Sequence, residues 1–319
     1  MNNLLINKYK PKEIEDLILD EQFVNFMNKL IHSDMLNLII VGNSSSGKTT
    51  LVKLIIKKYF NQENNNNILY IHGTKDQGIQ YYRNELQIFC KTCSTIKNKK
   101  KMVILDDFDL INEQSQQVFR NVMDNNNHSV FFIMTCINPH KLINSIQSRQ
   151  LLLHIPIPNN DKLFVKCKEI IINENIKIHD DVLKFIISLS NNSIICIINY
   201  LQKIKLIDEY ITMDNITNIV THINFKIFDD YFYYIKKRDF NACLNIFANL
   251  LDNGYSVIDI LDSLHIYLKQ SCNESLTEEI KYLIIKIICK YITAFYNVHE
   301  DDIELIFFTN NLFDIIPCD

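Results

Sequence analysis

The stretch LIIVGNSSSGKTTLVKLI (38–55) joins a short apolar run to a helical pattern through a loop that contains Gly42 and Gly47. The chain has only five glycines in 319 residues, so two glycines in one short loop mark a turn with special backbone needs. The segment GNSSSGKT (42–49) fits the phosphate-binding pattern G-x-x-x-x-G-K-[ST]. It also has the preceding strand and following helix that this pattern requires.

This loop predicts a site for ATP and Mg²⁺. Its glycines let backbone amides turn toward phosphates at the positive end of a helix dipole. We expect Lys48 to reach the β- and γ-phosphates and the Thr49 hydroxyl to bind Mg²⁺. The predicted nucleotide-binding residues of the loop are Gly42, Asn43, Ser44, Ser45, Ser46, Gly47, Lys48, Thr49 and Thr50.

A second apolar run, in KKKMVILDDFDL (99–110), ends in acidic residues. We expect Asp106 to hold the metal, usually through water, and Asp107 to polarise the attacking water. An apolar strand that ends in aspartate is common by itself. Its position behind a phosphate loop makes it a strong indication of a nucleotide site.

The first half of the chain alternates strand-like and helix-like segments. The apolar runs are 36–41, 68–72, 102–106, 130–136 and 151–155, and the helical patterns between them lie near 48–60, 79–94, 112–124 and 139–147. Continuous apolar strands separated by helices are typical of a parallel sheet that is covered on both faces. Pro156 and Pro158 mark the end of this α/β domain.

Beyond residue 160 the periodicity is helical almost throughout. Asp239 and Ser256 are expected helix N-caps, and Gly254 follows a helix where a C-terminal glycine belongs. We therefore expect three domains: a nucleotide-binding domain (1–156), a small helical domain (157–223) and a larger helical domain (224–319).

Composition limits the possible functions. The net charge of −4 and the pI near 6.1 mean that any nucleic acid would be bound by a local patch or by a larger assembly. No apolar run is long enough for a transmembrane helix, and the first residues lack the order of a signal peptide. We expect an intracellular protein with no membrane partner, in the nucleus or the cytoplasm.

The nine cysteines indicate reduced thiols rather than a disulfide framework. Cys90 and Cys93 have the spacing of metal ligands, but a structural zinc site needs a second pair of ligands, and no matching pair follows. We interpret them as two cysteines one helical turn apart.

Five segments, in order, resemble the AAA+ ATPases, and within them the replication factor C small subunits of sliding-clamp loaders. KYKP (8–11) is similar to the family's KYRP, and HGTKDQGIQYYR (72–83) is similar to its NASDxRGIxxVR. LDDFD (105–109) resembles the family's LDEAD, SQQVFRN (115–121) its AQxALRR, and IQSRQ (146–150) its IxSRC. The second of these segments keeps Asp76, Gly78, Ile79 and Arg83. The resemblance covers the first domain and much of the second, and the last third has only a suitable helical pattern.

The resemblance implies a fold and a function. The fold would be an AAA+ parallel-sheet domain, a small helical lid and an all-α collar that mediates oligomerisation. Such loaders are five-subunit assemblies that open a ring-shaped sliding clamp when ATP is bound and place it on primer–template DNA during replication. Hydrolysis then releases the clamp. The implied partners are other clamp-loader subunits, the sliding clamp and DNA.

The resemblance also implies roles for individual residues. Tyr9 and Pro11 would lie against the adenine, and Arg149 would be an arginine finger for the ATP of a neighbouring subunit. Arg83 and Arg120 match helix positions that contact DNA phosphates. Each arginine could instead be a solvated residue or part of an ion pair. We interpret the basic run KNKKK (97–101) as a solvated loop before a strand rather than as a dedicated DNA site.

Three departures from the family pattern concern hydrolysis. Asp107 stands where the family has glutamate, and its shorter side chain draws the carboxylate back. Ile195 and Cys196 replace the arginines of the lid-helix pattern. Ile137 occupies the sensor-asparagine position, with Cys136 and Asn138 beside it. We predict a subunit that binds ATP and Mg²⁺ but hydrolyses ATP slowly by itself.

Other interpretations remain open at this point. The chain could be a structural subunit that binds nucleotide, hydrolyses little of it and donates Arg149 to its neighbour. It could be another AAA+ machine on DNA, an initiator or a branch-migration motor, which would need a C-terminal winged helix with strands. The helical pattern over 224–319 disfavours that interpretation. A small-molecule kinase is disfavoured because we find no substrate-pocket signature.

Overall fold

The computed structural model describes residues 4–60, 65–74, 79–96, 98–190, 192–207, 210–212, 216, 223, 225–270, 277–295 and 298–316. Asp76 and Gly78 of the family-like segment 72–83 lie outside the described residues. The chain divides into two compact units, 1–213 and 214–319, which are described separately. The boundaries predicted at 156 and 223 stay a prediction.

The first unit contains one parallel sheet. Its strands are β1 (Leu38–Val41), β2 (Ile68–His72), β3 (Lys101–Asp106), β4 (Val130–Cys136) and β5 (Leu151–His154), in the spatial order β2-β3-β4-β1-β5. The five runs predicted as strands therefore all form strands. Strand β1 lies between β4 and β5 and pairs with both. The phosphate loop therefore follows an interior strand of the sheet.

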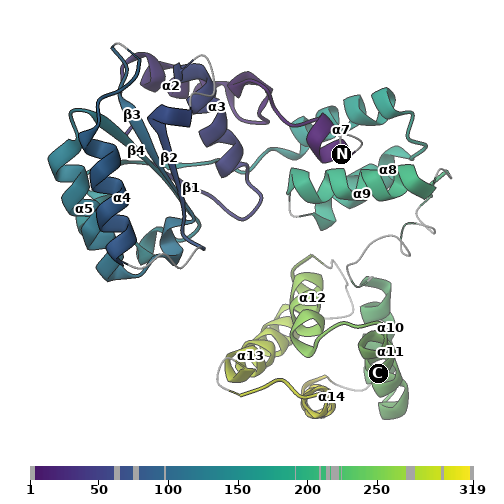
Figure 1. Ribbon diagram of the computed structural model, residues 1–319. Helices are drawn as coiled ribbons and strands as arrows, with labels where there is room; N and C mark the ends of the chain where they lie inside the picture. Colours follow the sequence, from purple (N-terminus) through teal and green to yellow (C-terminus); the bar gives the residue numbers. More distant parts are fainter. Residues whose placement is uncertain are drawn as a thin grey trace. The chain divides into compact units, whose positions relative to one another are not determined.

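Helices cover both faces of this sheet (Figure 1). They are α2 (Glu21–His32) and α3 (Lys48–Phe60) on one face, and α4 (Ile79–Lys91) and α5 (Glu113–Asn126) on the other. Strand β1 serves both cores, because Leu38 and Ile40 lie in one and Ile39 and Val41 in the other. Burial on both faces explains why the strand is apolar at every position. Helix α2 was not among the elements predicted from the sequence.

The helix expected over 139–147 is wrong in one respect, because the segment forms two short pieces. A 3-10 turn spans Pro139–Lys141 and α6 spans Asn144–Gln147. The Gln116 amide separates them: its nitrogen donates to the carbonyl of Lys141 at 3.1 Å, and its oxygen accepts from the amide of Ile143 at 3.0 Å. These backbone groups are thereby satisfied without a continuous helix.

The first unit also contains a bundle of helices. Helix α1 (Leu5–Lys8) packs on α9 (Ile194–Ile207), which packs with α7 (Asn160–Glu174) and α8 (Asp180–Leu189). We call α7 to α9 the lid helices. The N-terminal residues therefore belong in space to the lid helices, although the sheet follows them in sequence.

The second unit is helical in its described residues. It comprises α10 (Phe225–Lys236), α11 (Phe240–Asp252), α12 (Val257–Gln270), α13 (Glu278–Phe295) and α14 (Ile303–Ile315), around one hydrophobic core. The expected caps are present: Asp239 accepts from the amide of Ala242, Ser256 accepts from that of Asp259, and Gly254 has φ +89°. Among the described residues of the chain, no helix is long and apolar enough to cross a membrane.

Candidate nucleotide-binding site

The phosphate loop (42–49) leaves the carboxyl end of β1 and ends in the first turn of α3. Gly47 has φ +88°, and a Cβ on Gly42 would lie 2.6 Å from the hydroxyl oxygen of Ser46. Gly47 therefore needs glycine for its backbone, whereas a side chain at Gly42 would displace the Ser46 hydroxyl. The Lys48 ammonium donates to the carbonyl oxygens of Gly42 and Asn43, at 2.9 Å each, so it crosses the mouth of the loop.

The loop lines a cavity of about 390 Å³ that fits a polyphosphate. Residues 44–50 form one side, and Asp107, Asp109, Ile137 and Ile195 are among those that form the other. The Ser46 hydroxyl is buried and has no hydrogen-bond partner among the described residues, which suits an acceptor brought by a ligand. The buried ammonium of Lys48 and the start of α3 supply positive potential to the same space.

A hydrogen-bonded chain joins the predicted metal ligands. The Thr49 hydroxyl lies 3.1 Å from the nearer carboxylate oxygen of Asp106, at the end of β3. The Thr135 hydroxyl donates to the other oxygen of Asp106 at 2.5 Å and accepts from the amide of Asp107 at 3.0 Å. Thr49 and Asp106 together present the oxygen ligands that Mg²⁺ prefers. Sequence reasoning missed Thr135, although it is the polar residue of an otherwise apolar run.

Asp107 and Asp109 extend this edge of the sheet. Asp107 has a left-handed backbone, with φ 51°, and its carboxyl faces the cavity. Burial, and then the negative charge of Asp106, raise the pKa of Asp107 above its ordinary value. Asp109 accepts from the amides of Ile137 and Asn138, at 3.3 and 3.2 Å, and so holds the turn after β4.

The turn after β4 carries the residues considered for the sensor asparagine. Ile137 lines the cavity beside the phosphate loop, whereas Cys136 is buried in the sheet opposite Val41. The Asn138 side chain accepts from the amide of His140 at 3.0 Å and caps the next turn. The aliphatic side chain of Ile137 therefore occupies the position expected for the amide of a sensor asparagine.

A second cavity, of about 310 Å³, adjoins the first. The two share Ser45, Ser46, Gly47, Thr50 and Ile195, and the second is otherwise largely aliphatic, with Leu17, Leu19, Ile155, Ile194 and Ile198 among its lining residues. An apolar cavity next to a phosphate cradle suits a flat nucleotide base. Ile195 lines both cavities, whereas Cys196 lines neither and is exposed.

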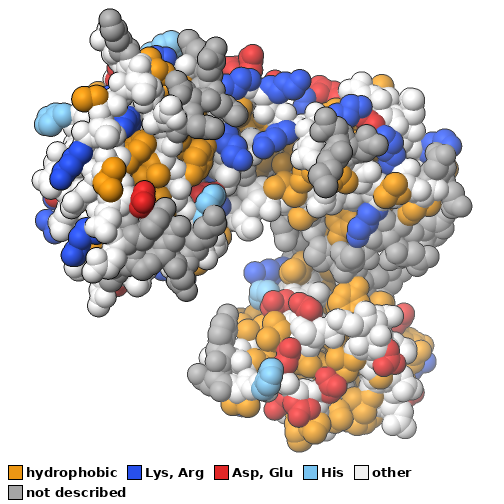
Figure 2. All heavy atoms as spheres, viewed as in Figure 1, with side chains coloured by type: hydrophobic (Ala, Val, Ile, Leu, Met, Phe, Trp, Pro, Cys, Tyr) orange, Lys and Arg blue, Asp and Glu red, His pale blue; other side chains and the backbone are white. Residues whose placement is uncertain are grey.

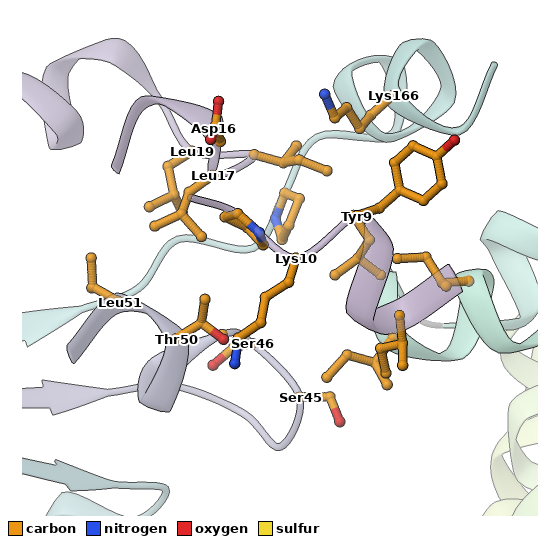
Figure 3. A pocket seen from close by; sticks show the side chains of 18 of the residues that line it. Tyr9, Lys10, Asp16, Leu17, Leu19, Ser45, Ser46, Thr50, Leu51 and Lys166 are labelled. Atoms are coloured by element: carbon orange, nitrogen blue, oxygen red, sulfur yellow. The ribbon is translucent and has the colours of Figure 1, made fainter. Parts of the chain in front are cut away.

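The predicted base-contacting residues line the second cavity. Tyr9 and Pro11 are both on its wall, and Lys10 points toward the phosphate loop (Figure 3). The Tyr9 hydroxyl points away from that loop in the same view, and it donates to the carboxylate of Glu174 at 2.7 Å. Only the ring of Tyr9 is therefore available to a bound base.

The predicted arginines lie elsewhere on the first unit. The Arg149 guanidinium donates to Asp124 at 2.5 Å and to the carbonyl of Ser145 at 2.6 Å. Arg120 lies 3.7 Å from the other oxygen of Asp124, and Arg83 is exposed on α4, beside a hollow between α4 and α5. Among the described residues, the linings of the two nucleotide cavities include none of these three arginines.

The two cysteines do not share one helical turn as expected, because α4 ends at Lys91, before Cys93. Cys90 is buried near the end of α4, where burial raises its pKa to about 11, and Cys93 is exposed. In the part of the chain that the structure describes, no group of three or more histidine, cysteine or acidic residues could hold a metal ion.

Comparison with known proteins decides the family. The model of the ATPase family associated with various cellular activities (AAA) matches residues 38–158, and the model of the replication factor C C-terminal domain matches residues 214–292. The chain therefore combines an AAA ATPase domain with a replication factor C C-terminal domain. The second match covers the part of the chain in which the sequence analysis found only a helical pattern.

Members of the replication factor C family resemble the chain over most of its length. A replication factor C small subunit of Picrophilus torridus is 26% identical over 83% of this chain and 84% of its own length. Replication factor C subunit 4 of Encephalitozoon cuniculi is 26% identical over 82% and 84%, and a putative small subunit of Acanthamoeba polyphaga mimivirus is 26% identical over 67% of each chain.

Solved structures agree on the fold. The RuvB Holliday junction branch migration motor of Thermotoga maritima superposes with a TM-score of 0.52 at 11% identity, over 66% of this chain and 72% of that one. At this identity the likeness concerns the fold alone. It confirms the expected AAA+ architecture, whereas the C-terminal match distinguishes the replication factor C family from a branch-migration motor.

Proposed function

We propose that this chain is a small subunit of a replication factor C-like clamp loader. It binds ATP with Mg²⁺, and with its partner subunits it opens a ring-shaped sliding clamp and loads it onto primer–template DNA during replication. The observation that carries this proposal is the pair of adjoining cavities, an aliphatic one beside Tyr9 and a polar one around Lys48, in a chain whose C-terminal part matches the replication factor C domain.

The phosphate end supports binding of ATP with its metal. Lys48 already makes two hydrogen bonds across the mouth of the loop, and a triphosphate would offer it charged acceptors in place of carbonyls. Thr49 and Asp106 supply the oxygens for Mg²⁺, whose chemistry is to neutralise charge that develops on the phosphates.

The environment of the γ-phosphate supports slow hydrolysis by the isolated subunit. Ile137 and Ile195 line the cavity where the family resemblance implies an amide and a guanidinium. Neither aliphatic side chain can stabilise developing negative charge. Asp107 is the remaining candidate to polarise water, and it carries the shorter acidic side chain.

These features also favour a second candidate function within the same assembly. In that case the subunit binds nucleotide to set the geometry of the loader, hydrolyses very little of it, and donates Arg149 to the ATP of a neighbour. The loss of the lid arginine at Ile195 is the specific observation in its favour. Single-turnover hydrolysis, with and without partner subunits, distinguishes the two.

Assembly and DNA contact complete the proposal. The second unit exposes Tyr282, Leu283, Ile306 and Phe307 on α13 and α14, apolar residues that suit contacts with other subunits. Figure 2 shows acidic and hydrophobic side chains together on the visible face of this unit. Arg83 on α4 and Arg120 on α5 are the candidates for DNA phosphates.

The test is reconstitution. The purified chain is mixed with the sliding clamp and the other loader subunits encoded by the same genome, and complexes are isolated with and without ATP. We expect an ATP-dependent complex with the clamp, and slow ATP turnover by the chain alone. Failure to associate with any of these proteins would contradict the clamp-loader proposal. Turnover by the isolated chain at the rate of the full complex would contradict slow hydrolysis.

A further inference from the structure

The carboxylate of Glu174, the last residue of α7, accepts three hydrogen bonds from outside its own helix. Lys8 and Tyr9 both donate to one oxygen, at 2.6 and 2.7 Å, and Lys205 of α9 donates to the other at 2.6 Å. The Glu174 side chain is only 5% exposed. The bonds from Lys205, Lys8 and Tyr9 lower the pKa of Glu174 to about 2, so it stays charged at neutral pH.

The same N-terminal segment has a second attachment to the lid helices. The amide of Leu5 donates to the side-chain oxygen of Gln202 at 2.8 Å, and the Leu5 side chain is buried. We call residues 5–9 the N-terminal strap. The strap is therefore bound at its start to Gln202 of α9 and at its end to Glu174 of α7, which also accepts from Lys205 of α9.

The strap also lines the second, largely aliphatic cavity, which we call the base-end cavity. Ile6, Asn7 and Tyr9 line it together with Ser46 and Gly47 of the phosphate loop. Tyr9 lines the cavity, and its side chain points away from the phosphate loop, with the hydroxyl bonded to Glu174 (Figure 3). The position of Tyr9 at the cavity thus depends on a carboxylate that does not line it.

We propose that Glu174 is a positioning residue for the base end of the nucleotide site. It fixes the N-terminal strap to the lid helices, so that strap, α9 and phosphate loop enclose the base of a bound nucleotide together. The inference rests on the proposed nucleotide binding and adds a residue that does not itself line either cavity.

The test compares two ligands that share phosphates but differ in the base. Dissociation constants are measured for ATP and for inorganic tripolyphosphate, with Mg²⁺, in the wild type and in Glu174→Gln. The variant keeps the size of the side chain but loses the charge that holds two ammonium groups and a phenol. We expect ATP to bind on the order of tenfold more weakly, and tripolyphosphate to bind as in the wild type.

Two further variants sharpen the comparison. Tyr9→Phe removes one of the three bonds to Glu174 and keeps the ring, so we expect a smaller loss, again for ATP only. Asp180→Asn is the matched control, because it removes a 2.7 Å ion pair between Lys168 of α7 and Asp180 without touching the strap. We expect it to leave both affinities unchanged.

The outcomes separate this inference from the proposed function. Wild-type affinity for ATP in a folded Glu174→Gln protein overturns the inference, and so does an equal loss of affinity for both ligands. If Glu174→Gln does not fold, Tyr9→Phe decides in the same way, by whether ATP affinity falls while that for tripolyphosphate does not. A wild-type protein that binds neither ligand overturns the proposed nucleotide binding instead.

Discussion

Arg149, after α6, and Asp124, on α5, are joined by a hydrogen bond of 2.5 Å. Both side chains are more than a third exposed, so the pair adds little to stability. A phosphate is a stronger partner for a guanidinium than one solvated carboxylate. If Arg149 acts as the arginine finger that we propose, exchanging this exposed pair for a phosphate therefore costs little.

We expect Arg149→Ala to lower ATP hydrolysis by the assembled complex about 10³-fold or more at the site that Arg149 reaches, because an arginine finger stabilises developing charge by that order. The chain's own affinity for ATP should not change, since Arg149 lines neither described nucleotide cavity. Steady-state turnover of the complex and ATP binding by the isolated chain are the measurements. Loss of the chain's own binding would mean that the finger assignment is wrong.

We expect Thr135→Val to slow single-turnover hydrolysis and to lower the free energy of unfolding by about 1–3 kcal/mol, because the Asp107 amide and an Asp106 oxygen lose a buried partner. Valine keeps the shape, so ATP affinity should fall less than the rate. Thr135→Ser keeps the hydroxyl and is the control. If serine and valine act alike, the hydroxyl is not what matters.

The sheet and the phosphate loop could be predicted because each follows from local patterns. Strand β1 is apolar at every position since both its faces are buried, and Gly47 needs a backbone that other residues rarely adopt. The single helix expected over 139–147 failed for a non-local reason. Gln116 of α5 bonds the backbone on either side of Leu142, and nothing within 139–147 records that contact.

The supporting residues of the site could not be predicted for the same reason. Thr135 acts through Asp106, and the register of β3 with β4 brings their strands together. Glu174 lies at the end of a helix far along the chain from Tyr9. Sequence motifs identify residues that contact a ligand. The residues that position those side chains are determined by tertiary packing instead.

We expect Asp107→Glu to raise the single-turnover rate of the isolated chain, by up to on the order of a hundredfold, because the longer side chain brings the carboxylate closer to the attacking water. Asp107 is already at the cavity, in a left-handed conformation that aspartate adopts more readily than glutamate, so the change should also lower stability slightly. ATP affinity should stay the same. An unchanged rate would indicate that Ile137 and Ile195, rather than the length of this acid, limit hydrolysis.

We expect Glu174 to make stability pH-dependent. Hydrogen bonds lower its pKa from the ordinary 4.5 to about 2, so its stabilising effect is complete above pH 4.5 and is lost as the pH falls toward 2. The difference in free energy of unfolding between wild type and Glu174→Gln should therefore shrink over that range. Urea unfolding from neutral pH down to about pH 3 measures it. A difference that does not change with pH would contradict the charged pairing.

Ile195 offers a direct test of the missing lid arginine. It lines both nucleotide cavities, whereas the adjacent Cys196 is exposed and lines neither. We expect Ile195→Arg to bring a guanidinium toward the phosphates and to tighten ATP binding about tenfold or more, since a hydrogen bond to a charged group contributes about 1.5–3 kcal/mol.

Cys196→Arg is the matched control for that change. It adds the same charge one position along α9, on a side chain that faces away from the cavities, so affinity should stay near that of the wild type. Titration of ATP and of ADP measures both variants, and a γ-phosphate contact should favour ATP. If both variants change ATP affinity equally, the added positive charge alone explains the change. Ile195 would then not be the position that corresponds to the lid arginine.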